Sequence, residues 1–168
     1  KPIDGGPPLA ADRAFRIEGM PIRPSARVAP SEFLETGFTA IDIMNSLVRG
    51  QKLPIFSGGG LPHDRIAVDI ACNARLPGGG AQEFAIVFAG IGIPHDSAEF
   101  FRRELEKSGA LARTVLFLNL ASDSSAQRLL TPRFALTAAE YLAFTEGKHV
   151  LVILTDMTNY CEALREVS

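Results

Sequence analysis

The chain has 168 residues, of which 46% are hydrophobic and 21% are charged. The apolar fraction excludes a disordered chain, and the length suits one domain large enough to bury a core. The formal net charge of −2, from 17 basic and 19 acidic residues, argues against strong electrostatic binding to nucleic acid or anionic lipid. No apolar run approaches the roughly 18 residues that span a bilayer, and the segment from Lys1 has no export-signal pattern.

The first part of the chain is rich in proline. Because proline fixes its own φ angle and has no amide donor, we expect residues 1–35 to form an extended segment that packs along, or links to, something else. Six of the eleven prolines lie in the first thirty residues: Pro2, Pro7, Pro8, Pro21, Pro24 and Pro30.

After Pro30 the pattern changes to alternating helical and strand-like runs. Apolar residues at helical spacing predict a helix over 39–48, which Gly50 ends. The short apolar run Leu53–Phe56 is expected to be a strand. Pro132 is expected in the first turn of its helix. The other expected elements are helices up to Leu76 and over 97–108, 131–144 and 159–167, a buried strand over 84–89, and further apolar strands over 115–120 and 150–154.

Short apolar strands that alternate with helices predict the α/β class, with a parallel sheet covered by helices on both faces. Ligands of such sheets gather beyond the carboxyl ends of the strands. The residues just after Phe56, Ala89, Leu120 and Leu154 are therefore the ones to search for chemistry.

A glycine-rich loop lies between the first of these expected strands and the next helix. It consists of Ser57, Gly58, Gly59, Gly60, Leu61, Pro62, His63 and Asp64, and we call it the glycine loop. This is the place of a phosphate-binding loop, where backbone amides and a helix N-terminus favour an anion. Aligned on the pattern GxxxxGK[ST], however, the loop begins with serine, and Pro-His-Asp replaces the closing Gly-Lys-Thr.

Each of these replacements weakens phosphate binding. Proline removes a donor, and histidine is mostly neutral at pH 7. Aspartate places a carboxylate at the positive end of the helix. The loop thus has the form of a phosphate-binding loop, but it carries a negative charge where such a loop carries a positive one. A tight glycine turn with Asp64 as a helix cap is the alternative interpretation.

The other strand ends carry weaker signals. After Ala89, Ile93 stands where a carboxylate would polarise an attacking water, and a turn capped by Asp96 or Ser97 is favoured over a functional pair of His95 and Asp96. After Leu154, Asp156 is a strand-end acid of the kind that supports Mg²⁺ in nucleotide sites, or a helix cap.

The remaining candidates have simpler interpretations. Arg133 is expected to be a solvated or ion-paired residue, with an interface role as the alternative. Cys72 and Cys161 are far apart and have no CxxC partner, so we expect two buried, reduced thiols. The sequence has no HExxH motif, no GxSxG motif and no cluster with zinc spacing. We therefore expect no catalytic residue and no metal ligand.

The sequence also resembles a known family. Residues 36–57, 60–64, 131–141 and 154–166 are similar, in order, to the B subunit of V-type and archaeal A-type rotary ATPases. Only residues 77–81 and 122–128 match loosely. The resemblance implies a P-loop NTPase (RecA-like) fold, with residues 36–168 as the front part of the nucleotide-binding domain. It also implies a fragment, because an intact B subunit has a β-barrel before this region and more sheet and helices after it.

The resemblance implies a regulatory, non-catalytic subunit that couples ATP turnover to transport of H⁺ or Na⁺. Its nucleotide loop, Ser57 to Asp64, is degenerate in that family, and the family's strand-end aspartate corresponds to Asp156. ATP or ADP with Mg²⁺ is expected only at interfaces with catalytic A subunits, which share a hexameric ring around a central stalk. The arginine that such subunits give to a neighbouring site lies beyond this chain, so Arg133 is not assigned that role.

The same resemblance places the chain on the cytoplasmic face of a membrane, attached only through the rest of the complex. It also implies an incomplete sheet, from which we expect an exposed apolar edge that is prone to association. Two other functions stay open. The chain could be a self-sufficient P-loop NTPase that uses His63 or Arg65 as a replacement cation, or an interaction module without a ligand.

Overall fold

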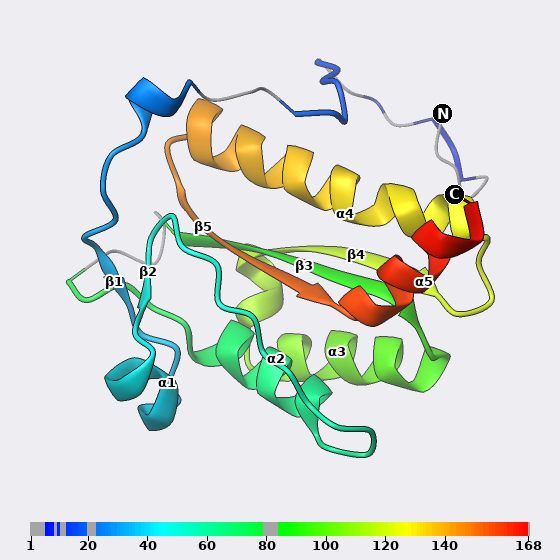
Figure 1. Ribbon diagram of the computed structural model, residues 1–168, viewed down its shortest axis with the longest axis horizontal. Coiled ribbons are helices and arrows are strands. Elements are labelled where there is room, and N and C mark those ends of the chain that lie inside the picture. The colour runs from blue at the N-terminus through cyan, green and yellow to red at the C-terminus, as the bar shows by residue number, and fades with distance from the viewer. Residues whose placement is uncertain (1–5, 9, 11–12, 20–22, 79–83, 168) are drawn as a thin grey trace.

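The structure, a computed structural model, describes residues 6–8, 10, 13–19, 23–78 and 84–167. A parallel three-stranded sheet lies at its centre, and its strand order is β4-β3-β5 (Figure 1). The strands are β3 (Phe84–Ile93), β4 (Thr114–Leu120) and β5 (His149–Thr155). The α/β class with a parallel sheet flanked by helices is therefore confirmed. In the described residues, no helix is long and apolar enough to cross a membrane.

The central strand β3 is buried at all ten positions, because both of its edges are paired and both of its faces are covered. Its side chains alternate between two apolar clusters. Phe84, Ile86 and Phe88 belong to one cluster, and Val87 and Ala89 belong to the other. This is the period-2 alternation of a strand whose two faces are both packed.

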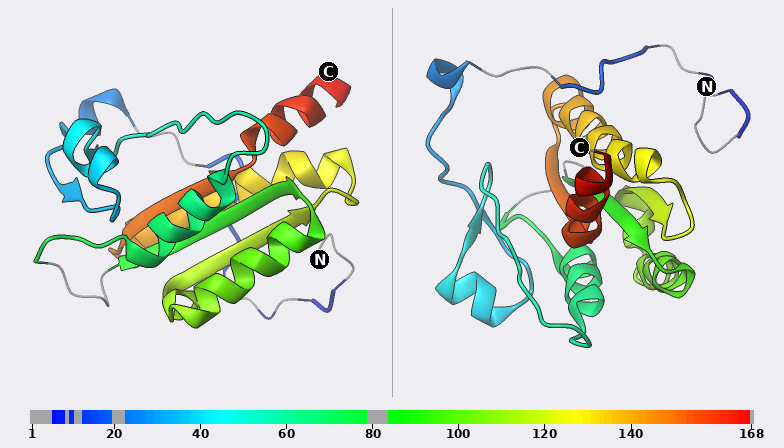
Figure 2. Two further views of the ribbon diagram at one scale, coloured as in Figure 1. Left: turned by 90° about the horizontal axis from the view of Figure 1, so that it is seen from below. Right: turned by 45° about the vertical axis from the view of Figure 1, so that its right-hand side comes forward.

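Helices cover the two faces of the sheet (Figures 1 and 2). The helices α2 (His63–Asn73) and α3 (His95–Lys107) pack on the first face, and α4 (Ser125–Glu140) packs on the other. The 3₁₀-helix η3 (Ala110–Arg113) leads into β4, the π-helix η4 (Tyr141–Thr145) extends α4, and α5 (Met157–Val167) packs against α4.

A small two-stranded ribbon lies beside the main sheet. It consists of the antiparallel strands β1 (Phe33–Leu34) and β2 (Leu47–Val48), and the short helix α1 (Thr39–Met44) lies between them. The Asp42 carboxylate accepts hydrogen bonds from the Thr36 amide and hydroxyl at 2.9 and 2.8 Å. Desolvation raises the pKa of Asp42, but these hydrogen bonds outweigh it and hold the pKa below its usual value.

Two expectations about this region are wrong. The helix predicted over 39–48 ends at Met44, because Leu47 and Val48 pair with β1 and thereby satisfy their backbone groups in a ladder. The run Leu53–Phe56 is neither strand nor helix, and Phe56 is 92% exposed. A strand needs a neighbouring strand to pair with, and the described residues give this run none.

The helix expected over 131–144 begins earlier, at Ser125. The Ser124 side chain caps it by accepting from the Gln127 amide. Pro132 therefore lies inside the helix and not in its first turn, although proline is unfavourable there. Pro132 is buried, so tertiary packing outweighs the lost amide donor. The expected elements up to Leu76 and over 84–89, 97–108, 115–120, 150–154 and 159–167 form with shifted ends.

The cysteine expectation is correct in one respect and wrong in another. Both thiols are free. Cys72 is half-buried and its sulfur lies 3.1 Å from the Ser108 hydroxyl, but Cys161 is exposed on α5. An apolar helical sequence did not reveal which side of α5 faces solvent.

The described part of residues 1–35 is mostly irregular, apart from the 3₁₀-helix η1 (Pro24–Ala26) and β1. It crosses α4, and the Phe15 ring packs on the Tyr141 ring with centroids 5.4 Å apart. Pro2 and Pro21 lie outside the described residues.

Candidate functional site

The glycine loop is exposed from Ser57 to Pro62 and forms a turn that leads into α2. The Leu61 amide donates to the Gly58 carbonyl at 3.3 Å, and the His63 amide donates to the Leu61 carbonyl at 2.8 Å. Gly60 has a φ of +81°, which favours glycine there. A side chain at Gly59 or Gly60 would meet no atom within 4 Å. The loop is thus open to solvent or to a partner.

The acid of the loop is turned towards α3. The Ser97 hydroxyl donates to Asp64 Oδ2 at 2.9 Å, and His63 Nε2 lies 3.6 Å from Asp64 Oδ1. Asp64 lies in the first turn of α2, where Pro62 occupies the cap position and no side-chain cap hydrogen bond forms. The alternative interpretation, with Asp64 as the helix cap, is therefore wrong in this respect. The Asp64 carboxylate instead accepts the hydrogen bond from the Ser97 hydroxyl on the neighbouring helix α3.

The nearest cation on α2 is already paired. Arg65 Nε lies 3.0 Å from Asp69 Oδ1, and Arg65 Nη1 lies 3.4 Å from Glu104 Oε2. The hydrogen bond to Asp69 raises the pKa of Arg65. On the other side, the hydrogen bond from Lys107 lowers the pKa of Glu104. Arg65 is therefore held among carboxylates along the α2–α3 seam.

Taken together, the loop residues do not by themselves fit a tightly bound Mg-nucleotide. Phosphate oxygens need a converging cation and free backbone amides. Here Pro62 has no amide hydrogen to donate, Asp64 brings a negative charge, and Arg65 is paired with Asp69 and Glu104. In the part of the chain that the structure describes, no group of three or more His, Cys, Asp and Glu residues could hold a metal ion.

Asp156 follows β5, as expected for a strand-end acid. Its Oδ1 accepts from the Thr158 amide at 2.9 Å, which caps the start of α5, and its own amide donates to the Ile91 carbonyl at 3.4 Å. These hydrogen bonds tie Asp156 to its own turn and to β3, and not to the glycine loop. A nucleotide-related role for Asp156 stays a prediction.

The end of β3 is filled by polar residues that the sequence did not reveal. Asn159 Nδ2 donates to the carbonyls of Ile91 and Gly92 at 3.0 and 2.9 Å, and Asn119 Oδ1 accepts from the Gly92 amide at 2.9 Å. Arg128 Nη2 donates to the Ala121 carbonyl at 3.0 Å. Because these partners come from β4, α4 and α5, no local motif marks them. Ile93 is buried here and supplies no carboxylate.

The neighbouring turn differs in detail from its prediction. Helix α3 begins at His95, and neither Asp96 nor Ser97 makes a cap hydrogen bond. Pro94 occupies the cap position, and Ser97 is engaged by Asp64 instead. His95 and Asp96 are exposed.

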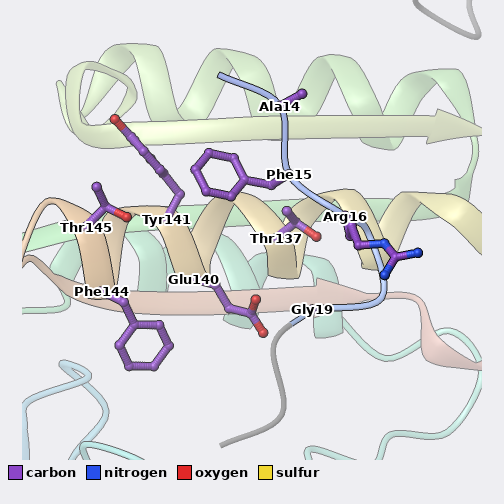
Figure 3. A pocket seen from close by; sticks show the side chains of 9 residues that line it. All are labelled: Ala14, Phe15, Arg16, Gly19, Thr137, Glu140, Tyr141, Phe144 and Thr145. Atoms are coloured by element: carbon purple, nitrogen blue, oxygen red, sulfur yellow. The ribbon is translucent and has the colours of Figure 1, made fainter. Parts of the chain in front are cut away.

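A shallow cavity of about 270 Å³ lies between α4, η4 and the N-terminal segment (Figure 3). Phe15 and Tyr141 face each other at one side of it, and Glu140 and Phe144 lie at the other. A second cavity beside it includes Arg133, which is exposed. Neither cavity includes a residue of the glycine loop.

Comparison with known proteins gives three findings. Residues 37–168 match the family model described as the ATP synthase alpha/beta family, nucleotide-binding domain. The chain is 61% identical over 163 residues to the B subunit of the A-type ATP synthase of Methanopyrus kandleri, across 97% of this chain and 16% of that protein. It is also similar to the structure of a unique ATP synthase subunit NeqB from Nanoarcheaum equitans. That likeness has a TM-score of 0.84 and 41% identity, and it covers all of this chain and 40% of the other.

The chain therefore spans 16% of the length of one relative and 40% of the other. The likeness lies in the part that includes the glycine loop and Asp156.

Proposed function

Since this chain belongs to the ATP synthase alpha/beta family, whose nucleotide-binding domain it matches over residues 37–168, we propose that it is part of a non-catalytic B subunit of a V/A-type rotary ATPase. In this role it supports nucleotide sites at the interfaces with catalytic A subunits and does not hydrolyse ATP itself. The similarity to two ATP synthase subunits supports the assignment to a rotary ATPase.

The observation that carries the non-catalytic role is the charge of the glycine loop. The loop has no lysine, Asp64 lies in the first turn of α2, and Ile93 supplies no acid at the end of β3. Phosphoryl transfer needs a cation at the phosphates and a residue that orients the attacking water. Both are missing from these positions, so the catalytic groups must come from a partner.

The proposal includes partners and a location. The partners are catalytic A subunits in a hexameric ring with a central stalk, and the complex transports H⁺ or Na⁺. ATP or ADP with Mg²⁺ binds between subunits, and the membrane contact is made by the rest of the complex on its cytoplasmic face. Exposure of the glycine loop is compatible with a site completed by a neighbour.

The test combines nucleotide titration with subunit co-purification. We expect isothermal titration of the purified chain with Mg-ATP to detect no micromolar binding. We also expect co-expression with the catalytic A subunit to give a complex that elutes as one species. An Asp64→Lys variant serves as a matched probe, because a cation in the first turn of α2 should strengthen the binding of nucleotide.

Micromolar binding of Mg-ATP by the chain alone, abolished by Asp156→Ala, would overturn the expectation that this chain binds nucleotide only at interfaces with A subunits. ATPase activity lost on His63→Ala would instead favour a self-sufficient NTPase. The ion pairs of Arg65 weigh against that second function. Failure to associate with any A subunit would leave only an interaction module.

A further inference from the structure

One side-chain hydrogen bond joins the start of α2 to the start of α3. The Ser97 hydroxyl donates to Asp64 Oδ2 at 2.9 Å, and this contact is partly buried. The other carboxylate oxygen, Asp64 Oδ1, lies 3.6 Å from His63 Nε2. Asp64 lies in the first turn of α2, where a carboxylate ordinarily interacts with the amides of its own helix. Here the carboxylate is bound to the neighbouring helix instead.

The glycine loop, which leads into α2, keeps amides that are able to donate. The backbone amides of Gly58, Gly59 and Gly60 donate to no acceptor among the described residues. No side-chain cap hydrogen bond forms at the start of α2. Amides that converge before a helix N-terminus favour an anion. These donors are therefore not used up by the Asp64 carboxylate, although Asp64 follows the loop closely in the chain.

The packing of α2 on α3 does not depend on the Ser97 hydroxyl. Val68 of α2 and Phe101 of α3 belong to the same apolar cluster, and each is at most 1% exposed. Arg65 forms a separate ion pair with α3. Loss of the hydroxyl would thus release the Asp64 side chain without separating the helices. The positive end of α2 would then attract the released carboxylate towards the loop.

We propose that Ser97 is a positioning residue for the glycine loop. Its hydroxyl holds the Asp64 carboxylate against α3 and keeps the negative charge away from the glycine amides. The inference rests on the proposed function, because a nucleotide phosphate bound between subunits would then meet amide donors at the loop. Without Ser97, the carboxylate would compete with the phosphate for these donors and repel it.

Paired nitroxide probes of opposite charge measure the electrostatic potential at single amides and test this role in the full chain. At about pH 8, histidine side chains are ordinarily neutral. In Ser97→Ala, relaxation of the amide protons of residues 58–60 by the cationic probe should rise roughly 1.5- to 3-fold relative to the anionic probe. Ser97→Thr, which keeps the hydroxyl, should restore the original ratio. In an Asp64→Asn background, Ser97→Ala should change nothing, because no charge is left to move.

Ser125→Ala is the matched control. The Ser125 hydroxyl donates to the Glu166 carboxylate between α4 and α5, so this variant removes a hydrogen bond of the same kind at another place. It should leave the ratio at residues 58–60 unchanged. An unchanged ratio in Ser97→Ala, or an equal change in the Asp64→Asn background, would overturn the proposal. Because the measurement needs neither nucleotide nor an A subunit, such a failure would leave the proposed function to its own titration and co-purification.

Discussion

Gly92 shows how one position fixes the end of the central strand. Its φ of +61° lies in the left-handed region, and a methyl group there would lie 2.6 Å from Arg128 Nε and 3.0 Å from Asn159 Cβ. The close approach lets Asn159 reach two β3 carbonyls. Glycine is needed at this position both for its backbone angle and for the space it leaves.

A pair of glycine substitutions separates these two reasons. Gly109 also has a positive φ, +75°, but a methyl group there meets nothing within 4 Å. We expect Gly109→Ala to lower the free energy of unfolding by about 1–2 kcal/mol from backbone strain alone. Gly92→Ala should cost about 2–4 kcal/mol, because crowding is added. Denaturant unfolding of both variants measures the difference, and equal losses would mean that Arg128 moves aside freely.

Some site residues could be located from sequence and others could not. The glycine loop and Asp156 follow apolar runs, so their positions are local in the chain. The partner of Asp64 is Ser97, which lies on another helix. The side chains that form hydrogen bonds with Gly92 come from two elements, Asn119 from β4 and Asn159 from α5. Such contacts depend on how the helices and strands pack together. The spacing of residues along the chain carries no information about that packing.

At the scale of elements, the apolar run Leu53–Phe56 is the main difference between expectation and structure. Like the strand His149–Thr155, it is a short and mostly apolar run. Composition alone cannot distinguish a paired strand from an unpaired run, because pairing depends on a neighbour. The same limit applies to α4, where Pro132 suggested a helix start and tertiary packing placed it in the interior.

Hydrogen exchange distinguishes a paired strand from an unpaired run at Leu53–Phe56. We expect the amides of residues 52–57 to exchange nearly as fast as those of an unfolded chain, since they lie in no ladder. Peptide-resolved mass spectrometry measures this rate, and the amides of β5 serve as the protected control. Protection of residues 53–56 equal to that of β5 would restore the strand interpretation.

At the scale of the whole molecule, the exposed apolar side chains are numerous beside the glycine loop. Ile55 is 49% exposed and Leu61 is 57% exposed, in addition to Phe56. The outer edges of β4 and β5 have no paired strand among the described residues. Both features are typical of surfaces that a partner covers.

We expect the isolated chain to self-associate through this surface. Sedimentation velocity over a range of concentrations should show a rising mean mass, and Ile55→Ser with Phe56→Ser should reduce it. Val28→Ser, at an exposed position in the N-terminal segment, is the matched control and should change nothing. A monomer at every concentration, with two-state unfolding, would contradict this expectation.

The order of the strands also has a consequence for synthesis. The central strand β3 is translated before both of its neighbours, because β4 and β5 follow it in the chain. Ten consecutive residues suited only to the interior therefore leave the ribosome with no partner on either edge. They stay unpaired on one side until residue 155 has emerged. During that interval the nascent chain is a natural client for chaperones that shield apolar strands.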